Sequence, residues 1–283
     1  MTLPGAVSTE WLAERLGSAG LRVLDASWYL PALGRDARAE YATGHIPGAL
    51  FFDLDAVSDH ATTLPHMLPR PEAFARAMTE LGLTDDDKVV VYDGTGSNMS
   101  AARAWWMFRV FGHGAVAVLD GGLATWRREG RPLEAGGVGL APGRFTARLD
   151  HAAIRGLDDL RENLRTGREQ VVDLRPAGRF SGADPEPRAG LRGGHIPGSR
   201  SLPYTALVAP DGTLLPPEAL RRRLLDAGVD PTRPIVATCG SGTSACTLLH
   251  ALHLLGHDQA ALYDGSWTEW GGRDDTPIAT GPA

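Results

Sequence analysis

The stretch Pro234-Ile-Val-Ala-Thr-Cys239-Gly-Ser-Gly-Thr-Ser-Ala-Cys246 contains the transition that decides the fold. Residues 235–238 suit a buried strand, and they lead directly to Cys239. From residue 245 onward, apolar residues recur at steps of three and four, which predicts a helix. The sequence therefore predicts a strand, a short glycine-containing loop and a helix in direct succession.

A cysteine at the centre of such a loop is a candidate nucleophile. Successive backbone N–H groups and the N-terminus of a helix stabilise anions, and thiolate is the reactive form of cysteine. Gly240 and Gly242 give the backbone the freedom to curl around the sulfur. The alternative is that Cys239 is a buried structural cysteine at the end of a strand.

Composition restricts the kinds of protein that this chain can be. The chain has 283 residues, a net charge of −6 and two cysteines, and its charges are interspersed. This length suits one large domain or two of ordinary size, and no basic run indicates binding of nucleic acid or an anionic membrane. The two cysteines do not form a disulfide framework and favour a reducing compartment. The N-terminal residues lack the pattern of a signal peptide, and no apolar run would span a bilayer, so we expect a cytoplasmic protein.

The two halves of the chain repeat one pattern. Gly-His-Ile-Pro-Gly occurs at 44–48 and again at 194–198, and Phe111-Gly-His113 corresponds to Leu255-Gly-His257. Each half alternates strands and helices, which predicts two α/β domains, each a mainly parallel sheet flanked by helices. We expect the domains at residues 1–135 and 151–283, with 136–150 as the linker. Ligands of such sheets bind at the carboxyl ends of the strands, where the cysteine loop should lie.

The repeat also indicates that only one half carries the nucleophile. Aligning Val89-Val-Val-Tyr-Asp93 with Ile235-Val-Ala-Thr-Cys239 places Asp93 at the position of the cysteine. A carboxylate repels an anion and cannot act as a sulfur nucleophile. We therefore expect the first domain to be catalytically silent and to lend residues to a cleft between the halves.

These features together resemble the rhodanese-type sulfurtransferases. The loop sequence Cys-Gly-Ser-Gly-Thr-Ser-Ala is similar to that of the branch that uses 3-mercaptopyruvate, usually Cys-Gly-Ser-Gly-Val-Thr-Ala, whereas thiosulfate-using relatives usually carry basic residues after the cysteine. Two positions depart from the pattern, Thr243 in place of valine and Ser244 in place of threonine. The segments 24–31, 34–38 and 66–69 also look like this branch, and the resemblance covers nearly the whole chain.

The resemblance implies a sulfur transfer without a cofactor or a metal. Cys239 takes the sulfur of 3-mercaptopyruvate as a persulfide, pyruvate leaves, and a thiol or cyanide accepts the outer sulfur. The acceptor is expected to be a small thiol, a thioredoxin-like protein or cyanide. The persulfide would be held by the backbone N–H groups of the loop, from Gly240, Ser241, Gly242, Thr243, Ser244 and Ala245.

The same resemblance assigns roles to side chains outside the loop. Arg179 and Arg188 match the arginines that bind the carboxylate and ketone of the substrate, a task that suits guanidinium groups. Ser241, His66 and Asp55 match a proton relay, for which His66 would have to reach across from the silent domain. Asp53 and Asp59 could serve in place of Asp55, and the Ser241 hydroxyl could instead satisfy loop N–H groups.

Three other functions fit parts of the sequence. A thiosulfate:cyanide sulfurtransferase would favour cations beside the cysteine, where Gly240 and Ser241 carry none. A cysteine phosphatase needs an arginine six positions after the cysteine, and Ala245 occupies that position. A non-enzymatic persulfide carrier would leave Arg179 and Arg188 without a purpose.

His45 and His195 are expected to be structural. Each lies in a copy of Gly-His-Ile-Pro-Gly, and one copy belongs to the half that is expected to be silent.

Overall fold

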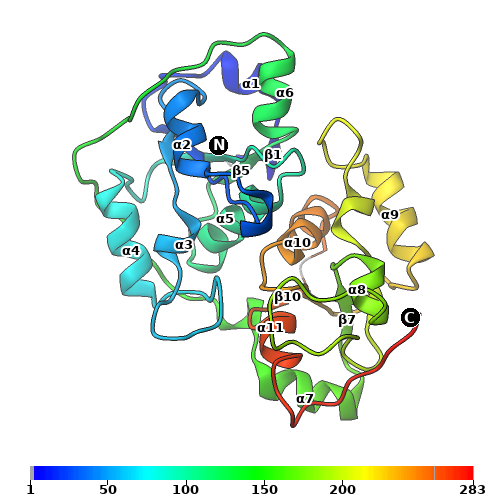
Figure 1. Ribbon diagram of the computed structural model, residues 1–283. Helices are drawn as coiled ribbons and strands as arrows, with labels where there is room; N and C mark the ends of the chain where they lie inside the picture. The colour runs from blue at the N-terminus through cyan, green and yellow to red at the C-terminus, as the bar shows by residue number, and fades with distance from the viewer. Residues whose placement is uncertain (1–2, 258, 283) are drawn as a thin grey trace. The chain divides into compact units, whose positions relative to one another are not determined.

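The computed structural model describes residues 3–257 and 259–282 and divides into two compact units (Figure 1). The first contains the residues up to His60 together with Leu68–Asp150 and Ala209–Leu214. The second contains Ala61–Met67, His151–Val208 and the residues from Leu215 onward. Each unit thus includes one short segment from the other half of the sequence, and His66 belongs to the second unit. The expected boundaries at 135 and 151 stay a prediction.

The two units contain the same type of sheet. In the first, five parallel strands lie in the order β1 (Ala6–Val7), β5 (Val116–Leu119), β4 (Lys88–Tyr92), β2 (Leu21–Asp25) and β3 (Leu50–Phe51). In the second, the order is β6 (Ile154–Arg155), β10 (Ala260–Tyr263), β9 (Ile235–Thr238), β7 (Gln170–Asp173) and β8 (Arg200–Ser201), again parallel. The predicted α/β class and the tandem arrangement are confirmed.

Helices flank both sheets, as Figure 1 shows for each unit. The α-helices of the first unit are α1 (Thr9–Ala13), α2 (Ala37–Thr43), α3 (Leu54–Val57), α4 (Pro71–Glu80), α5 (Met99–Val110) and α6 (Gly122–Arg128). Those of the second are α7 (Leu157–Thr166), α8 (Ala177–Ser181), α9 (Pro217–Asp226), α10 (Ala245–Leu254) and α11 (Ser266–Trp270). Short 3₁₀ turns lie at Pro31–Leu33, His151–Ala153 and Tyr204–Leu207.

Strand β4 shows why these sheets are covered on both faces. Its residues from Val89 to Tyr92 are all fully buried, which is typical of a central parallel strand. Successive side chains point to opposite faces, and Val90 and Tyr92 pack in one cluster with Leu12 of α1 and Trp126 of α6. Helix α5 packs on β4 and β5, and α10 packs correspondingly on β9 and β10. The two central strands therefore end beneath the N-termini of α5 and α10.

Local sequence signals place the ends of several helices. Ser8 caps α1, because its hydroxyl accepts a hydrogen bond from the N–H of Trp11. Helix α4 begins at Pro71, because proline suits the first helical position. No helix among the described residues is both long and apolar enough to cross a membrane.

The histidines of the two Gly-His-Ile-Pro-Gly motifs have equivalent environments. The His45 ring stacks on Tyr41 with centroids 4.0 Å apart, and the His195 ring stacks on Phe180 at 3.7 Å. The Nδ1 atoms lie 2.8 and 2.9 Å from the carbonyl oxygens of the same two aromatic residues. This repeated packing supports the structural role expected for both histidines.

Candidate active site

Cys239 follows the central strand of the second sheet. Strand β9 lies between β10 and β7 and is buried over its whole length, so it delivers Cys239 to the carboxyl edge of the sheet. The Cys239 side chain is buried, with 2% of its surface exposed. Helix α10 begins at Ala245, six residues later. The expected strand, loop and helix are all present.

Helix α11 fixes the direction of the loop peptides. The carbonyl of Cys239 accepts from the N–H of Trp267 at 2.9 Å. The carbonyl of Gly240 accepts from the N–H of Thr268 at 2.9 Å and from its hydroxyl at 2.6 Å. In a trans peptide the C=O and the following N–H point in opposite directions. The N–H groups of Gly240 and Ser241 therefore point away from α11.

The loop retains unused backbone donors at the N-terminal side of α10. Within the described part of the chain, no acceptor binds the N–H groups of Gly240, Ser241, Thr243, Ser244 and Ala245. Gly242 takes a left-handed conformation, with a φ of 76°, whereas Gly240 does not. Only one of the two loop glycines is thus needed for its backbone conformation. The arrangement suits an anion on the sulfur of Cys239.

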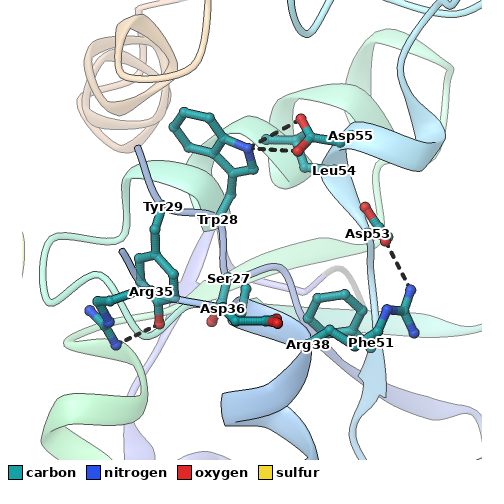
Figure 2. Close-up of a pocket in the computed structure, with 11 residues that line it drawn as sticks. Ser27, Trp28, Tyr29, Arg35, Asp36, Arg38, Phe51, Asp53, Leu54 and Asp55 are labelled. Carbon is teal, nitrogen blue, oxygen red and sulfur yellow. Dashed lines mark hydrogen bonds and ion pairs between the residues drawn. The ribbon is translucent and has the colours of Figure 1, made fainter. Parts of the chain in front are cut away.

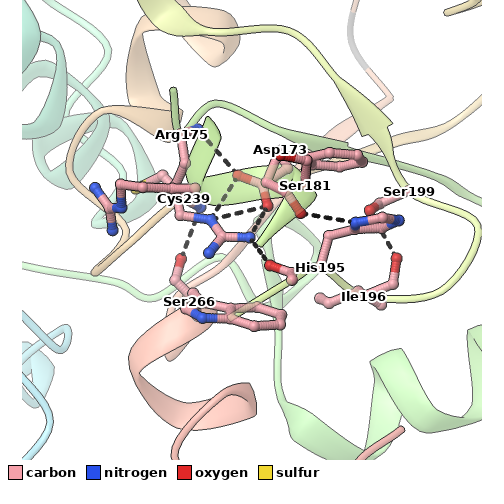
Figure 3. A network of polar contacts seen from close by, with 12 residues as sticks. Asp173, Arg175, Ser181, His195, Ile196, Ser199, Cys239 and Ser266 are labelled. Carbon is pink, nitrogen blue, oxygen red and sulfur yellow. Dashed lines mark hydrogen bonds and ion pairs between the residues drawn. The ribbon is translucent and has the colours of Figure 1, made fainter. Parts of the chain in front are cut away.

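Ser266 is a site residue that the sequence analysis missed. It is fully buried and has a positive φ of 50°, which is uncommon for a residue with a side chain. Its hydroxyl accepts from the N–H of Cys239 at 3.2 Å and donates to the carbonyl of Tyr263 at 2.8 Å. Figure 3 shows Ser266 beneath Cys239. The available signal was the repeat, because the equivalent residue of the first half is Gly122, with a φ of 54°.

His66 and Ser241 lie within hydrogen-bonding distance of each other. His66 Nδ1 lies 2.9 Å from Ser241 Oγ and 3.1 Å from Thr243 Oγ1. All three side chains are buried, and His66 has a positive φ of 61°, a conformation that non-glycine residues adopt at an energetic cost. The Thr243 hydroxyl is a second partner for His66 that a valine at this position would not provide. The sequence analysis noted the substitution but not this contact.

Asp55 and Asp53 have different partners within the first unit (Figure 2). Both carboxylate oxygens of Asp55 accept from the indole N–H of Trp28, at 3.0 and 3.1 Å. Asp53 caps α3 by accepting from the N–H of Ala56 and pairs with Arg38 at 2.8 Å. Both carboxylate oxygens of Asp53 therefore have partners in the first unit, one at the N-terminus of α3 and the other on Arg38. That Asp55 supports His66 stays a prediction.

Asp53 and Asp55, together with Trp28 and Arg38, line a pocket of about 330 Å³ in the first unit. Figure 2 shows aromatic and charged side chains among those that line it, and each labelled arginine has an oxygen partner. Arg35 binds Glu40 at 2.5 Å and the Tyr29 hydroxyl at 2.8 Å. One ion pair of this pocket, Arg38 with Asp53, joins two lining residues, whereas Arg35 is neutralised by Glu40 outside the lining.

The two predicted substrate arginines lie beside the cysteine loop. A methyl group added to Gly240 would be 3.2 Å from Nη2 of Arg179 and 3.9 Å from Nη1 of Arg188. Arg179 is bound by Glu186, which also binds the buried Arg175. The sequence analysis missed Glu186 and Arg175. A signal was present in Asp173-Leu-Arg175, where a buried strand ends on one charged residue and a second follows two positions later.

The loop of the first unit is filled by Asp93. This carboxylate is buried and accepts from the N–H and hydroxyl of Thr95, at 2.8 and 2.6 Å. It also accepts from the N–H and hydroxyl of Ser100 and from the N–H of Ala101, at distances between 2.9 and 3.1 Å. Asp93 thus occupies the anion-binding position with its own side chain, which supports the expected catalytic silence of this unit.

Comparison with known proteins identifies similar chains. The model of the rhodanese-like domain matches residues 8–129 and again residues 156–273. The chain is 48% identical over 269 residues to human 3-mercaptopyruvate sulfurtransferase, covering 93% of this chain and 91% of that protein. It is 44% identical over 270 residues to thiosulfate sulfurtransferase from Cricetulus griseus, covering 93% of this chain and 91% of that protein. The crystal structure of SseA from Escherichia coli, a 3-mercaptopyruvate sulfotransferase, has a TM-score of 0.86 at 43% identity, covering 93% and 99% of the two chains.

Proposed function

Because the chain belongs to the family of rhodanese-like domain proteins, with one such domain in each half, we propose that it is a 3-mercaptopyruvate sulfurtransferase. The observation that carries this choice of donor is the position of Arg179 and Arg188 beside Gly240, next to Cys239. Guanidinium groups bind carboxylates and carbonyl oxygens, both of which this substrate contains. The relatives at this level of identity are sulfurtransferases, so the reading as a non-enzymatic carrier is set aside.

In the first half-reaction, the Cys239 thiolate attacks the thiol sulfur of 3-mercaptopyruvate. A sulfur–sulfur bond forms and the carbon–sulfur bond breaks, and its electron pair leaves with the carbon fragment as an enolate. The thiol proton is transferred to the enolate carbon, which gives pyruvate and leaves Cys239 as a persulfide anion. The loop N–H groups stabilise that anion, and Arg179 and Arg188 hold the carboxylate and the ketone.

His66 and Ser241 are proposed to move the proton. The contact between His66 Nδ1 and Ser241 Oγ at 2.9 Å supports this role, because histidine exchanges protons near neutral pH. Asp55 is proposed to orient His66. No step requires a cofactor or a metal.

In the second half-reaction, a thiolate or the carbon of cyanide attacks the outer sulfur of the persulfide. The sulfur–sulfur bond breaks, the acceptor leaves as a persulfide or as thiocyanate, and the Cys239 thiolate is regenerated. The acceptor is proposed to be a small thiol, a thioredoxin-like protein or cyanide. Both cysteines are free thiols in the described chain, which suits a reducing compartment, and we propose the cytoplasm.

Thiosulfate is the second candidate donor, since one similar relative is a thiosulfate sulfurtransferase. Identity therefore does not choose between the donors by itself. The uncharged Gly240 and Ser241 favour 3-mercaptopyruvate, because a dianion would be bound better with cations at these positions.

The test is to measure pyruvate release from 3-mercaptopyruvate, and thiocyanate formation from each donor with cyanide, for the wild type and Cys239→Ser. We expect a preference for 3-mercaptopyruvate and a loss of about a thousandfold or more in the variant, because hydroxyl oxygen does not form a persulfide. Mass spectrometry should detect one added sulfur atom on the wild type only. Undiminished turnover by Cys239→Ser would refute the mechanism, and a preference for thiosulfate would refute the choice of donor.

A further inference from the structure

Four charged side chains of the second unit form a continuous cluster that ends at the cysteine loop. Asp173, Arg175 and Glu186 are almost completely buried, each with 1% of its side chain exposed, and Arg179 is 17% exposed. Burying charges is costly unless each is paired and hydrogen-bonded. All four groups meet this condition through their mutual ion pairs, so the cluster holds its charged groups in fixed positions.

Arg175 is the anchor of the cluster. Its guanidinium binds both carboxylate oxygens of Asp173, at distances from 2.6 to 3.1 Å, and the carbonyl of Gly194 at 2.7 Å. It also lies 4.1 Å above the centre of the Trp267 ring. Burial by itself lowers the pKa of Arg175, but the carboxylates of Asp173 and Glu186 outweigh it and raise the pKa. Figure 3 shows Arg175 and Asp173 paired next to Cys239.

Glu186 connects this anchor to the loop. One carboxylate oxygen accepts from Nη1 of Arg175 at 2.7 Å. The other accepts from Nε of Arg179 at 3.1 Å and from its Nη2. Since Arg175 is held from several sides, Glu186 has a fixed position and in turn fixes the plane of the Arg179 guanidinium. Nη2 of Arg179 is the atom that approaches Gly240.

The charges of the cluster cancel. Two guanidinium groups, Arg175 and Arg179, face two carboxylates, Asp173 and Glu186. Arg179 therefore provides directed N–H donors beside Gly240, while the carboxylate of Glu186 offsets its positive charge. A donor that carries two negative charges gains less from such a group than from an unpaired cation, and it is also repelled by Glu186.

We propose that Glu186 is a specificity-determining positioning residue, which orients Arg179 toward the cysteine loop and offsets its charge so that a singly charged keto acid is preferred to a doubly charged sulfur donor. This inference rests on the proposed function and extends it by naming the residue that selects the charge of the donor. Specificity of this kind is a difference between two affinities, which repulsion of the wrong ligand increases.

The first test compares donors in Glu186→Gln, which removes the charge and keeps the shape. We expect the ratio of kcat/KM for thiosulfate to that for 3-mercaptopyruvate to rise about tenfold, through KM for thiosulfate. Glu186→Asp retains the charge and should change the ratio by less than about threefold. Glu169→Gln removes a carboxylate from the ion pair with Arg155 in the same unit and should leave the ratio unchanged.

Arg179→Gln provides a second variant, whose side chain is less buried. It removes the cation while Glu186 remains, so the ratio should move in the opposite direction, against thiosulfate. A purely structural role for Glu186 predicts equal losses with both donors in Glu186→Gln. Equal losses would overturn the proposal.

A binding measurement separates this proposal from the proposed activity. The measurement uses the Cys239→Ser background and calorimetry. Glu186→Gln should raise the affinity for sulfate, a dianion, about tenfold relative to the affinity for pyruvate, a monoanion. If neither donor were turned over by the wild type, the proposed function would fail while the sulfate shift would still support a charge-selecting Glu186. An unchanged ratio of the two affinities, or no sulfate binding to either protein, would contradict the role of Glu186.

Discussion

The loop that contains Asp93 and the loop that contains Cys239 hold equivalent places in the two units but differ in what fills them. Each follows the central strand of its sheet and precedes a long buried helix. Gly96 and Gly242 occupy equivalent positions with φ values of 77° and 76°. The loops differ at their last position, where Asn98 has a φ of 54° and Ser244 a φ of −69°. The fold therefore provides a loop of the same length in the same place twice, and the residue at its first position decides what the loop does.

The difference between the loops lies in how their donors are used. In the first, Thr95, Ser100 and Ala101 all donate to the carboxylate of Asp93. In the second, Cys239 is a smaller and uncharged group when protonated, and it leaves N–H groups such as those of Gly240 and Ser241 available. A loop that is filled by its own side chain is stable and inert, whereas an unfilled one can bind an anion formed during a reaction.

The hydroxyl groups of the two loops also turn to different partners. Thr95 donates its hydroxyl to Asp93. The hydroxyls of Ser241 and Thr243 instead lie against Nδ1 of His66. Equivalent side chains thus satisfy a structural carboxylate in one unit and contact a titratable ring in the other.

Among the variants that test the difference between the two loops, Asp93→Ala is expected to have the largest effect, and this effect is on stability. The change leaves several buried donors without an acceptor, so the free energy of unfolding should fall by about 3 kcal/mol. Asp93→Asn keeps one acceptor oxygen and should cost about half as much. Urea titration followed by tryptophan fluorescence measures both. Equal stability of Asp93→Ala and the wild type would show that the first loop does not depend on its carboxylate.

A somewhat smaller effect is expected from His66→Gln. If the Ser241 and His66 contact moves a proton, kcat should fall by about a hundredfold, equivalent to about 2.7 kcal/mol in the activation barrier. Ser241→Ala should have a similar effect, and the double variant should be little worse than either single one.

Thr243→Val is the matched control for that experiment, because it removes the second hydroxyl near His66 without changing the size of the side chain. We expect a change in kcat of less than about threefold. The decisive measurement is kcat of the three variants side by side. If Thr243→Val loses as much kcat as His66→Gln, packing around the ring accounts for the loss and His66 does not carry the proton.

The smallest effects should come from Ser266, whose equivalent in the first unit is Gly122. Ser266→Gly and Ser266→Ala both remove the hydroxyl that accepts from Cys239 N–H, so both should lower kcat by several-fold, about equally. The glycine variant also relieves the left-handed backbone and should be about 1 kcal/mol more stable than the alanine variant. Thermal unfolding measures this difference. If activity followed stability across the two variants, the hydroxyl would have no role in positioning Cys239.

Much of this site could be predicted from the sequence because the relevant signals are local. The strand, the glycines and the helix pattern around Cys239 follow one another directly along the chain. The repeat identified Asp93 as the counterpart of Cys239. Other contacts could not be predicted in this way. His66 lies 175 positions from Ser241, and Ser266 lies 27 positions from Cys239.

The sequence by itself determined the α/β class, the duplication, the position of the cysteine loop and the presence of a carboxylate in its counterpart. These properties follow from hydrophobic periodicity, glycine positions and motif order, which act over short distances along the chain. Tertiary structure alone decided that Ser266 takes a left-handed conformation under Cys239 and that Glu186 joins Arg175 to Arg179. A buried charge or a strained backbone is stabilised only by partners that folding brings together, so its role depends on contacts that no local pattern encodes.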